Sequence, residues 1–182
     1  MNDYRYIILN KPYGYVSQFS GEGATLKEFD LPNHIYAAGR LDKDSEGLLL
    51  LTNDGPFIEQ FLLHHERAYW VQVDHDIEQM SIEKLRCGVQ IKTGPTAPCK
   101  VIKIEEPAVW ERTPPIRVRK SIPTSWLEVI LKEGKNRQIR RMTAAVGHPT
   151  LRLIRSRLGK LSLADIGLKP GEWKEVHRDQ IL

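Results

Sequence analysis

The chain has 182 residues, 41% of them hydrophobic and 27% charged, and a formal net charge of +4. This length supports a core without disulfides, and no stretch reaches the roughly 18 apolar residues of a membrane span. Cys87 and Cys99 form neither a C-x-x-C pair nor a metal pattern, and no secretion signal precedes them, so we expect a cytoplasmic protein without a membrane partner.

The first third of the chain is predicted to contain short strands and one helix. Apolar runs bounded by Gly, Pro or Asn indicate strands, and apolar residues three or four positions apart indicate a helix. Pro56 suits a first helical turn, and Phe57 and Phe61 then recur at helical spacing up to His64 and His65. Strands are predicted at residues 4–9, 15–19, 35–41 and 48–52.

The rest of the chain is predicted to alternate strands and helices around a long excursion rich in Pro and Arg. In the second helix of this part, Ile139, Met142, Thr143 and Val146 share one face, and three arginines lie opposite. Periodicity alone predicts an α+β or α/β class and one domain with approximate lobes 1–65 and 66–182. Strands are predicted at 68–74, 99–105, 125–134 and 148–159, helices at 81–88 and 136–147, and the excursion at 107–123.

Charge is distributed unevenly along the chain. Residues 112–160 contain 13 Lys or Arg and two Asp or Glu, a local charge of +11, and the remaining residues carry −7. Because apolar strand residues are interleaved with these cations, the segment is not a disordered tail. Such a block indicates either a solvated face or an anionic partner such as a nucleic acid.

An acidic loop precedes the apolar run of the first lobe, in the stretch Gly39–Gly55, "GRLDKDSEGLLLLTNDG". Asp42, Asp44 and Glu46 stand just before four leucines, which are typical of a strand covered on both faces. These acids are either solvated turn residues or functional groups held by a rigid scaffold. Arg40, two positions from Asp42 on an extended segment, points to the same side and favours the functional interpretation.

Four motifs follow one another: "KPYG" from Lys11, the Gly39–Gly55 stretch, "AYWVQV" around Tyr69 and "EGKNRQIRRM" from Glu133. In this order, and over essentially the whole chain, they resemble the bacterial rRNA pseudouridine synthases of the RsuA/RluB/E/F type. The segment 114–155 most resembles a member that acts on large-subunit rRNA. The resemblance implies an α+β pseudouridine synthase fold, with a long, bent, mainly antiparallel sheet flanked by helices and a central catalytic cleft.

The resemblance also implies cofactor-free isomerisation of uridine to pseudouridine in 23S rRNA. The N-glycosidic bond breaks, the uracil turns, and its C5 joins the ribose C1′. A carboxylate either attacks C1′ or takes a proton from C2′, and both routes stay open. Asp42 matches the family's aspartate, whereas Asp44 and Glu46 do not. Arg140 matches the basic residue paired with that aspartate, although it could instead only contact phosphate.

Base flipping is implied as well, because a stacked uridine hides its C1′. Tyr69 matches the family tyrosine that stacks on the uracil, although a strand tyrosine is more often part of a core. Arg40 either fills the space that the uridine leaves or contacts phosphate. The predicted RNA-binding residues are Arg40, Lys11, Arg117, Arg119, Lys120, Arg137 and Arg141.

The expected partner is 23S rRNA or the pre-ribosomal large subunit, bound by a monomer. Many relatives carry an S4 RNA-binding domain ahead of the catalytic core, and this chain starts close to "KPYG", so we expect recognition by the core itself. His64 and His65 lack a third ligand at useful spacing, so no metal is expected, and the resemblance implies that no cofactor is needed. The alternatives are a non-catalytic ribosome-assembly factor that binds rRNA, and a glycoside hydrolase, which would need a second carboxylate about 5 to 9.5 Å away.

Overall fold

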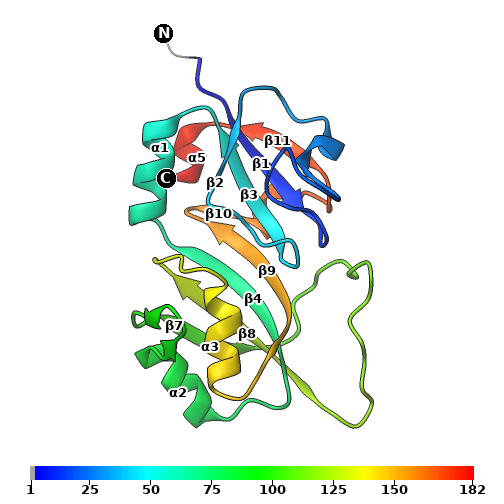
Figure 1. Ribbon diagram of the computed structural model, residues 1–182, viewed down its shortest axis with the longest axis vertical. Helices are drawn as coiled ribbons and strands as arrows, with labels where there is room; N and C mark the ends of the chain where they lie inside the picture. The colour runs from blue at the N-terminus through cyan, green and yellow to red at the C-terminus, as the bar shows by residue number, and fades with distance from the viewer. Residues whose placement is uncertain (1–2) are drawn as a thin grey trace. The chain divides into compact units, whose positions relative to one another are not determined.

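The computed structural model describes residues 3–182 and divides them into two compact units. Unit 1 comprises the residues up to Arg67 together with Ile154–Leu182, and unit 2 comprises Ala68–Leu153. Unit 1 is coloured blue to cyan and orange to red in Figure 1, and unit 2 green to yellow. The boundary between the units after Arg67 lies near the expected lobe boundary at 65/66. The sequence did not indicate that the C-terminal segment Ile154–Leu182 belongs to the same unit as the N-terminal residues.

Unit 1 is built from short strands and short helices. Its strands are β1 (Tyr6–Lys11), β2 (Tyr36–Ala38), β3 (Glu46–Thr52), most of β9 (Thr150–Leu158), β10 (Leu161–Ser162) and β11 (Trp173–Val176). Its helical segments are the 3₁₀-helix η1 (Leu26–Phe29) and the α-helices α1 (Gly55–His64), α4 (Leu163–Ile166) and α5 (Arg178–Ile181).

Strand β3 is the buried centre of unit 1. All seven of its residues are buried, which confirms the prediction of a strand covered on both faces. β3 pairs antiparallel with β1 and β2, and its first two residues, Glu46 and Gly47, pair parallel with β9. Helix α5 lies beside α1, with the Arg178 guanidinium 5.2 Å from the centroid of the Phe57 ring, and Figure 1 shows the two helices next to each other. The apolar run is therefore enclosed, and the acidic loop lies at its entrance.

Helix α1 forms where its sequence signals place it. Asp54 caps the helix by accepting a hydrogen bond from the Phe57 backbone N–H at 3.1 Å, and Pro56 stands in the first turn. The Tyr6 hydroxyl donates to the other Asp54 oxygen at 2.5 Å. Phe57 and Phe61 are buried, so the predicted apolar face of this helix is confirmed.

Unit 2 combines an antiparallel set of strands with two longer helices. β8 lies between β4 and β7 in its sheet, and β5 and β6 form a separate hairpin. Its strands are β4 (Arg67–Asp74), β5 (Gln90–Ile91), β6 (Gly94–Pro95), β7 (Lys100–Ile104) and β8 (Thr124–Leu131). Its helices are α2 (Gln79–Cys87) and α3 (Gln138–Ala145).

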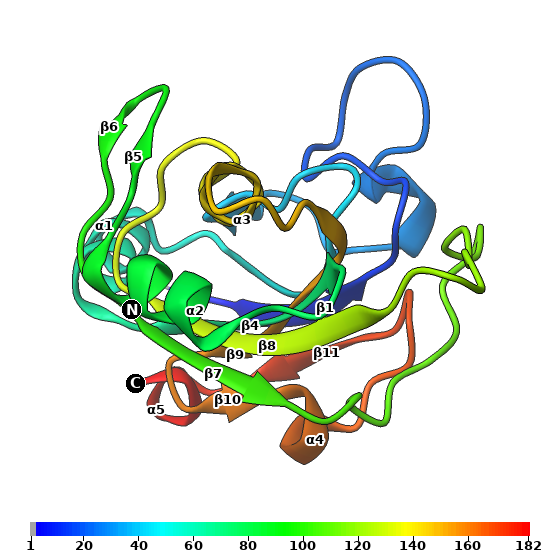
Figure 2. The same cartoon turned by 90° about the horizontal axis from the view of Figure 1, so that it is seen from below.

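The core of unit 2 covers only one face of these strands. Side chains alternate across a strand, so Val71 and Val73 of β4 lie on the same face as Leu127 and Val129 of β8. Ile82 of α2 and Ile139 of α3 belong to the same cluster, and Figure 2 shows both helices on one side of β4 and β8. The side chains on the opposite face of β4 and β8 do not belong to this core.

Most predicted elements are present, and the class is α+β with mainly antiparallel strand pairs. The predicted strand at 15–19 is wrong, because this segment is a bend whose Val16 and Gln18 bond locally to Ala24 and Leu26. The polar C-terminal segment contains α4, β11 and α5, which periodicity did not reveal because each has only four residues. Within residues 3–182 no helix is long and apolar enough to cross a membrane.

Candidate functional site

The acidic loop, residues 39–47, is a turn held at its backbone. The Ser45 N–H donates to the Asp42 carbonyl at 3.0 Å, and the N–H of Gly14 donates to the Lys43 carbonyl at 2.7 Å. Just before the turn, the buried Ser17 hydroxyl accepts from the Leu41 N–H at 3.0 Å and lies 2.7 Å from the Leu41 carbonyl. The backbone on either side of Asp42 is thus fixed by bonds to other segments of unit 1.

Arg155 of β9 clamps both ends of this loop. Its side chain is buried, with 2% exposure, and it donates from Nε to the Leu48 carbonyl at 2.8 Å and from Nη2 to the Gly39 carbonyl at 3.1 Å. An arginine fork suits two acceptors at fixed positions. This role was not predicted, because Arg152, Arg155 and Arg157 alternate with other residues of the strand and nothing local distinguishes the arginine that bonds to the acidic loop.

Gly47 permits the close approach of β3 and β9. Its φ is +105°, and a Cβ there would lie 2.3 Å from the Arg155 carbonyl oxygen and 2.8 Å from its nitrogen. No side chain fits at that distance from a backbone. Gly39, at the other end of the loop, also has a positive φ of +77°. Both glycines thus adopt backbone angles that favour glycine, and Gly47 also gives the β9 backbone room to approach.

Lys11, a predicted RNA contact, does not lie on the surface. It is fully buried, and its Nζ donates to the carbonyls of Pro12 and Tyr15, both at 2.8 Å. Burial lowers the pKa of this amine to about 7, against the opposing attraction of Glu46 and the smaller contributions of Asp44 and Asp42. Lys11 therefore organises the "KPYG" turn beneath the acidic loop, and we remove it from the predicted RNA surface.

Exposure differs among the charged residues of the loop. Arg40 is exposed, Asp42 and Asp44 are half-buried, and Glu46 is buried at the start of β3. Lys11 and Arg155 are basic residues enclosed in unit 1, and Lys11 interacts electrostatically with all three acids and with Arg155.

Helix α3 presents arginines on the side away from its apolar face, as predicted. Ile139, Met142 and Thr143 are buried and Val146 packs against the core of unit 2. Arg137, Arg140 and Arg141 lie on the remaining surface, the first exposed and the other two half-buried. Arg137 occupies the N-cap with a left-handed φ of +49°.

The turn before α3 is organised by a buried glutamine. Gln138 accepts from the Lys135 N–H at 3.0 Å and donates from Nε2 to the Glu133 carboxylate at 2.7 Å. Glu133 also accepts from the Ala97 N–H at 2.7 Å. This polar residue at the first helical position was not recognised from the sequence, which gave weight only to the arginines that follow it.

Tyr69 lies on the helix side of β4. It is half-buried and packs against the unit 2 core, which contains Ile139 and Met142 of α3. Unit 2 thus brings the predicted tyrosine and the helix that carries Arg140 to one face of its sheet. Both the core interpretation and the stacking interpretation of Tyr69 accord with a ring that is only partly covered.

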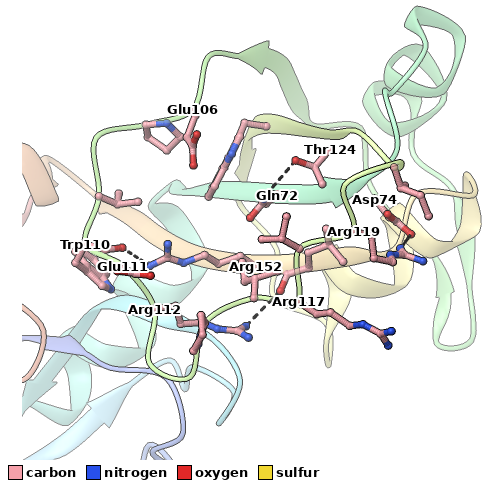
Figure 3. Close-up of a pocket in the computed structure, with 18 of the residues that line it drawn as sticks. Gln72, Asp74, Glu106, Trp110, Glu111, Arg112, Arg117, Arg119, Thr124 and Arg152 are labelled. Carbon is pink, nitrogen blue, oxygen red and sulfur yellow. Dashed lines mark hydrogen bonds and ion pairs between the residues drawn. The ribbon is translucent and has the colours of Figure 1, made fainter.

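The excursion carries the remaining predicted cations to the other face of this sheet. Arg117, Arg119 and Lys120 are exposed and line a pocket of about 570 Å³ together with Gln72 of β4. Figure 3 shows this pocket with Arg119 beside Asp74, to which its Nη2 binds at 2.5 Å. The Arg119 hydrogen bond holds the pKa of the Asp74 carboxyl below its usual value.

No metal-binding cluster of three or more His, Cys, Asp or Glu side chains occurs among residues 3–182. His65 stacks on Phe61, with ring centroids 4.8 Å apart. This contact gives His65 a packing role at the C-terminal end of α1. Cys87 and Cys99 are both free thiols.

Known proteins are similar to this chain along most of its length. Residues 5–145 match the family model described as RNA pseudouridylate synthase. The ribosomal large subunit pseudouridine synthase E of Vibrio parahaemolyticus is 51% identical over 175 residues, 93% of this chain and 73% of the relative. The protein of the same name from Xanthomonas campestris pv. campestris is 52% identical over 176 residues, 92% and 93% of the two chains.

A solved structure has the same fold. A crystal structure of a pseudouridylate synthase matches with a TM-score of 0.81 and 28% sequence identity, and the match covers all of this chain and 74% of the other. The match includes both units, and it supports the assignment of the α+β pseudouridylate synthase fold to this chain.

Proposed function

This chain belongs to the RNA pseudouridylate synthase family, and on that premise we propose that it isomerises a uridine of 23S rRNA to pseudouridine without a cofactor. The observation that carries the choice of substrate is the identity of 51–52%, over more than nine tenths of the chain, to synthases named for the large ribosomal subunit. We propose that the enzyme works as a monomer in the cytoplasm, on rRNA or on an assembling large subunit.

We infer that Asp42 supplies the reacting carboxylate. Ser17 and Arg155 bond to the backbone of its loop, so the segment that carries the carboxylate has a defined position in unit 1. One Asp42 oxygen either forms a bond to ribose C1′ as the bond from C1′ to uracil N1 breaks, or takes the proton from C2′. After the uracil turns, C5 joins C1′ as the bond between Asp42 and C1′ breaks or, in the second route, as the proton returns to C2′. C5 then loses its proton to solvent and N1 gains one, so the carboxylate is regenerated.

Two residues of unit 2 complete the proposed chemistry. Arg140 is the candidate cation beside the Asp42 carboxylate, and a guanidinium there would keep the acid charged as water leaves the site. Tyr69 is the candidate platform for the flipped uracil, since a flat ring stabilises an unstacked base. Arg40, Arg137 and Arg141 are proposed to contact the RNA backbone, and their exposed or half-buried positions support this role.

Release of tritium from C5-labelled uridine tests the activity directly. We expect the purified protein, at a concentration far below that of a 23S rRNA transcript, to release many equivalents of tritium. Binding without release would instead identify an rRNA-binding assembly factor, and free uracil as product would identify a glycosidase. Mapping pseudouridines in cells that lack the protein would then locate the uridine, and a loss confined to tRNA or small-subunit rRNA would contradict the proposed substrate.

A further inference from the structure

The pocket beneath the excursion is a second place at which unit 2 can bind a ligand. It measures about 570 Å³, within the roughly 300–1,000 Å³ typical of ligand sites. Its floor is the face of β4 and β8 that carries Gln72, Thr124 and Trp126, and its roof is the excursion. The core of unit 2, with Tyr69 packed on it, uses the alternate side chains of the same strands. The sheet therefore separates this pocket from Tyr69.

The roof of the pocket is attached to the strands at several points. Arg152, which is buried, donates from Nη2 to the Trp110 carbonyl at 2.9 Å, and its guanidinium lies 5.8 Å from the centroid of the Trp110 ring. Arg112 donates to the Leu151 carbonyl at 3.4 Å, and Arg119 is paired with Asp74. Figure 3 shows the Trp110 and Asp74 attachments at opposite ends. These contacts hold the roof over the floor and so define the pocket.

The lining combines flat, apolar and hydrogen-bonding surfaces. The indole of Trp110 is half-buried, and Val118, in the roof, is 83% exposed. On the floor, the Gln72 amide donates to the Thr124 hydroxyl at 3.1 Å, which leaves the amide oxygen and further protons of both groups for a ligand. A nucleobase presents a π-face and an edge of donors and acceptors, so it suits these surfaces.

The charge of the lining favours a ligand that carries phosphate. Arg117 and Lys120 are exposed and make no hydrogen bond or ion pair within the described part of the chain, so both cations are available. An acidic peptide would use these cations but would leave the tryptophan and the amide without a matching group. The charged residues that line the pocket are Arg112, Arg117, Arg119, Lys120 and Arg152 against Asp74, Glu106 and Glu111.

We propose that this pocket holds one unpaired nucleobase of the substrate RNA, different from the uridine that is isomerised, with its phosphate on Arg117 and Lys120. The inference rests on the proposed function for the identity of the RNA. A base captured here, on the other side of the sheet from Tyr69, would contribute to the choice of substrate without taking part in the chemistry.

Two matched pairs of variants test the pocket through RNA affinity. Trp110→Leu keeps an apolar side chain but removes the flat ring, and Trp110→Phe restores a ring. We expect Trp110→Leu to weaken binding of a 23S rRNA transcript about 5- to 150-fold and to raise KM far more than it lowers kcat. We expect Trp110→Phe to recover most of the loss.

The second pair tests the phosphate contact. Lys120→Ala should weaken binding of the transcript, whereas Lys92→Ala, which changes an exposed lysine outside the pocket, should not. Thermal unfolding of each variant checks its fold.

Photo-crosslinking identifies the bound nucleotide. With thionucleotides incorporated into the transcript, we expect a crosslink between residues 106–122 and a nucleotide other than the pseudouridine. The proposal is overturned if that segment crosslinks only to the modified position, or to none, or if Trp110→Leu binds naked rRNA as well as wild type. A Trp110→Leu defect seen only on pre-ribosomal particles would also overturn it and would indicate a protein partner. Failure of the proposed function would appear as absent tritium release by wild type, while affinity and crosslinks could still be measured.

Discussion

The acidic loop of unit 1 and the excursion of unit 2 are both irregular segments, but they are held in different ways. The acidic loop is fixed by the buried side chains of Ser17 and Arg155, which bond to its backbone. The excursion is attached partly by surface contacts such as Arg119 with Asp74. A loop that carries a reacting atom needs one exact geometry, whereas a loop that binds a long substrate tolerates contacts that exchange. The comparison predicts larger losses of stability in the first loop than in the second.

The largest loss is expected at Gly47. Gly47→Ala forces a Cβ against the Arg155 backbone, and we expect it to lower the free energy of unfolding by about 3–5 kcal/mol. Gly94→Ala is a matched control, because Gly94 has a similar φ of +113° and no atom within 4 Å of an added Cβ. Its cost should be about 1–2 kcal/mol, from backbone strain alone. Equal losses in urea unfolding would show that the close approach of β3 and β9 is unimportant.

The next largest effect is expected from the Arg155 clamp. Arg155→Met retains a long side chain but leaves the carbonyls of Gly39 and Leu48 without their donor, and we expect a loss of about 2–4 kcal/mol. Arg155→Lys keeps the charge without the forked geometry and should recover only part of the loss. Denaturation at several salt concentrations gives the measurement. A loss below about 1 kcal/mol would contradict the proposed clamp.

Lys11 predicts a pH dependence of intermediate size. Its pKa is about 7 in the folded protein and 10.5 ordinarily, so between these values the unfolded chain binds a proton that the folded chain does not. The free energy of unfolding therefore rises with pH, by about 2 kcal/mol between pH 7 and 9. The neutral amine still has two protons for the carbonyls of Pro12 and Tyr15.

Lys11→Met removes this rise, so the quantity to measure is the difference between wild type and variant. The window ends at pH 9, because burial raises the pKa of Cys99 to about 11, and above its ordinary value of 9.0 that thiol lowers the stability as pH increases. A difference that stays constant from pH 7 to 9 would mean that the ammonium of Lys11 is not destabilised by its surroundings.

The smallest effect is expected in the excursion. Arg119→Ala should cost less than about 1 kcal/mol, because the Arg119 side chain is 43% exposed and surface ion pairs are weak and screened by salt. In 1 M salt the difference from wild type should almost vanish, whereas the loss in Arg155→Met should persist. A large, salt-independent loss for Arg119→Ala would remove the contrast between the two loops.

Local patterns in the sequence predicted most of the helices and strands. The features that they did not predict depend on contacts with residues distant in the sequence. The helix at α1, the apolar face of α3 and the buried run of β3 follow from spacing, capping and composition within short windows. Lys11 and Arg155 look like surface cations, because nothing local shows that backbone carbonyls surround them. The return of the C-terminal segment to unit 1 depends on β1 pairing with β11, across more than 160 residues.

The candidate site shows the same division between local and long-range signals. Asp42, Tyr69 and Arg140 were proposed as catalytic residues because they match motifs of the family, and their roles stay predictions. The supporting residues Ser17, Gln138 and Arg155 were missed, since each acts on the backbone of a segment distant in sequence or on a turn with no side-chain signal of its own.

The most direct test of the whole account is pseudouridine formation by Asp42→Asn beside Asp44→Asn. Both substitutions remove one carboxylate charge from the same loop and both residues are half-buried, but only Asp42 is proposed to reach the ribose. The account predicts that Asp42→Asn binds rRNA and releases tritium at least about 10³-fold more slowly, while Asp44→Asn keeps most of its activity. Tritium release by Asp42→Asn at the wild-type rate would contradict it.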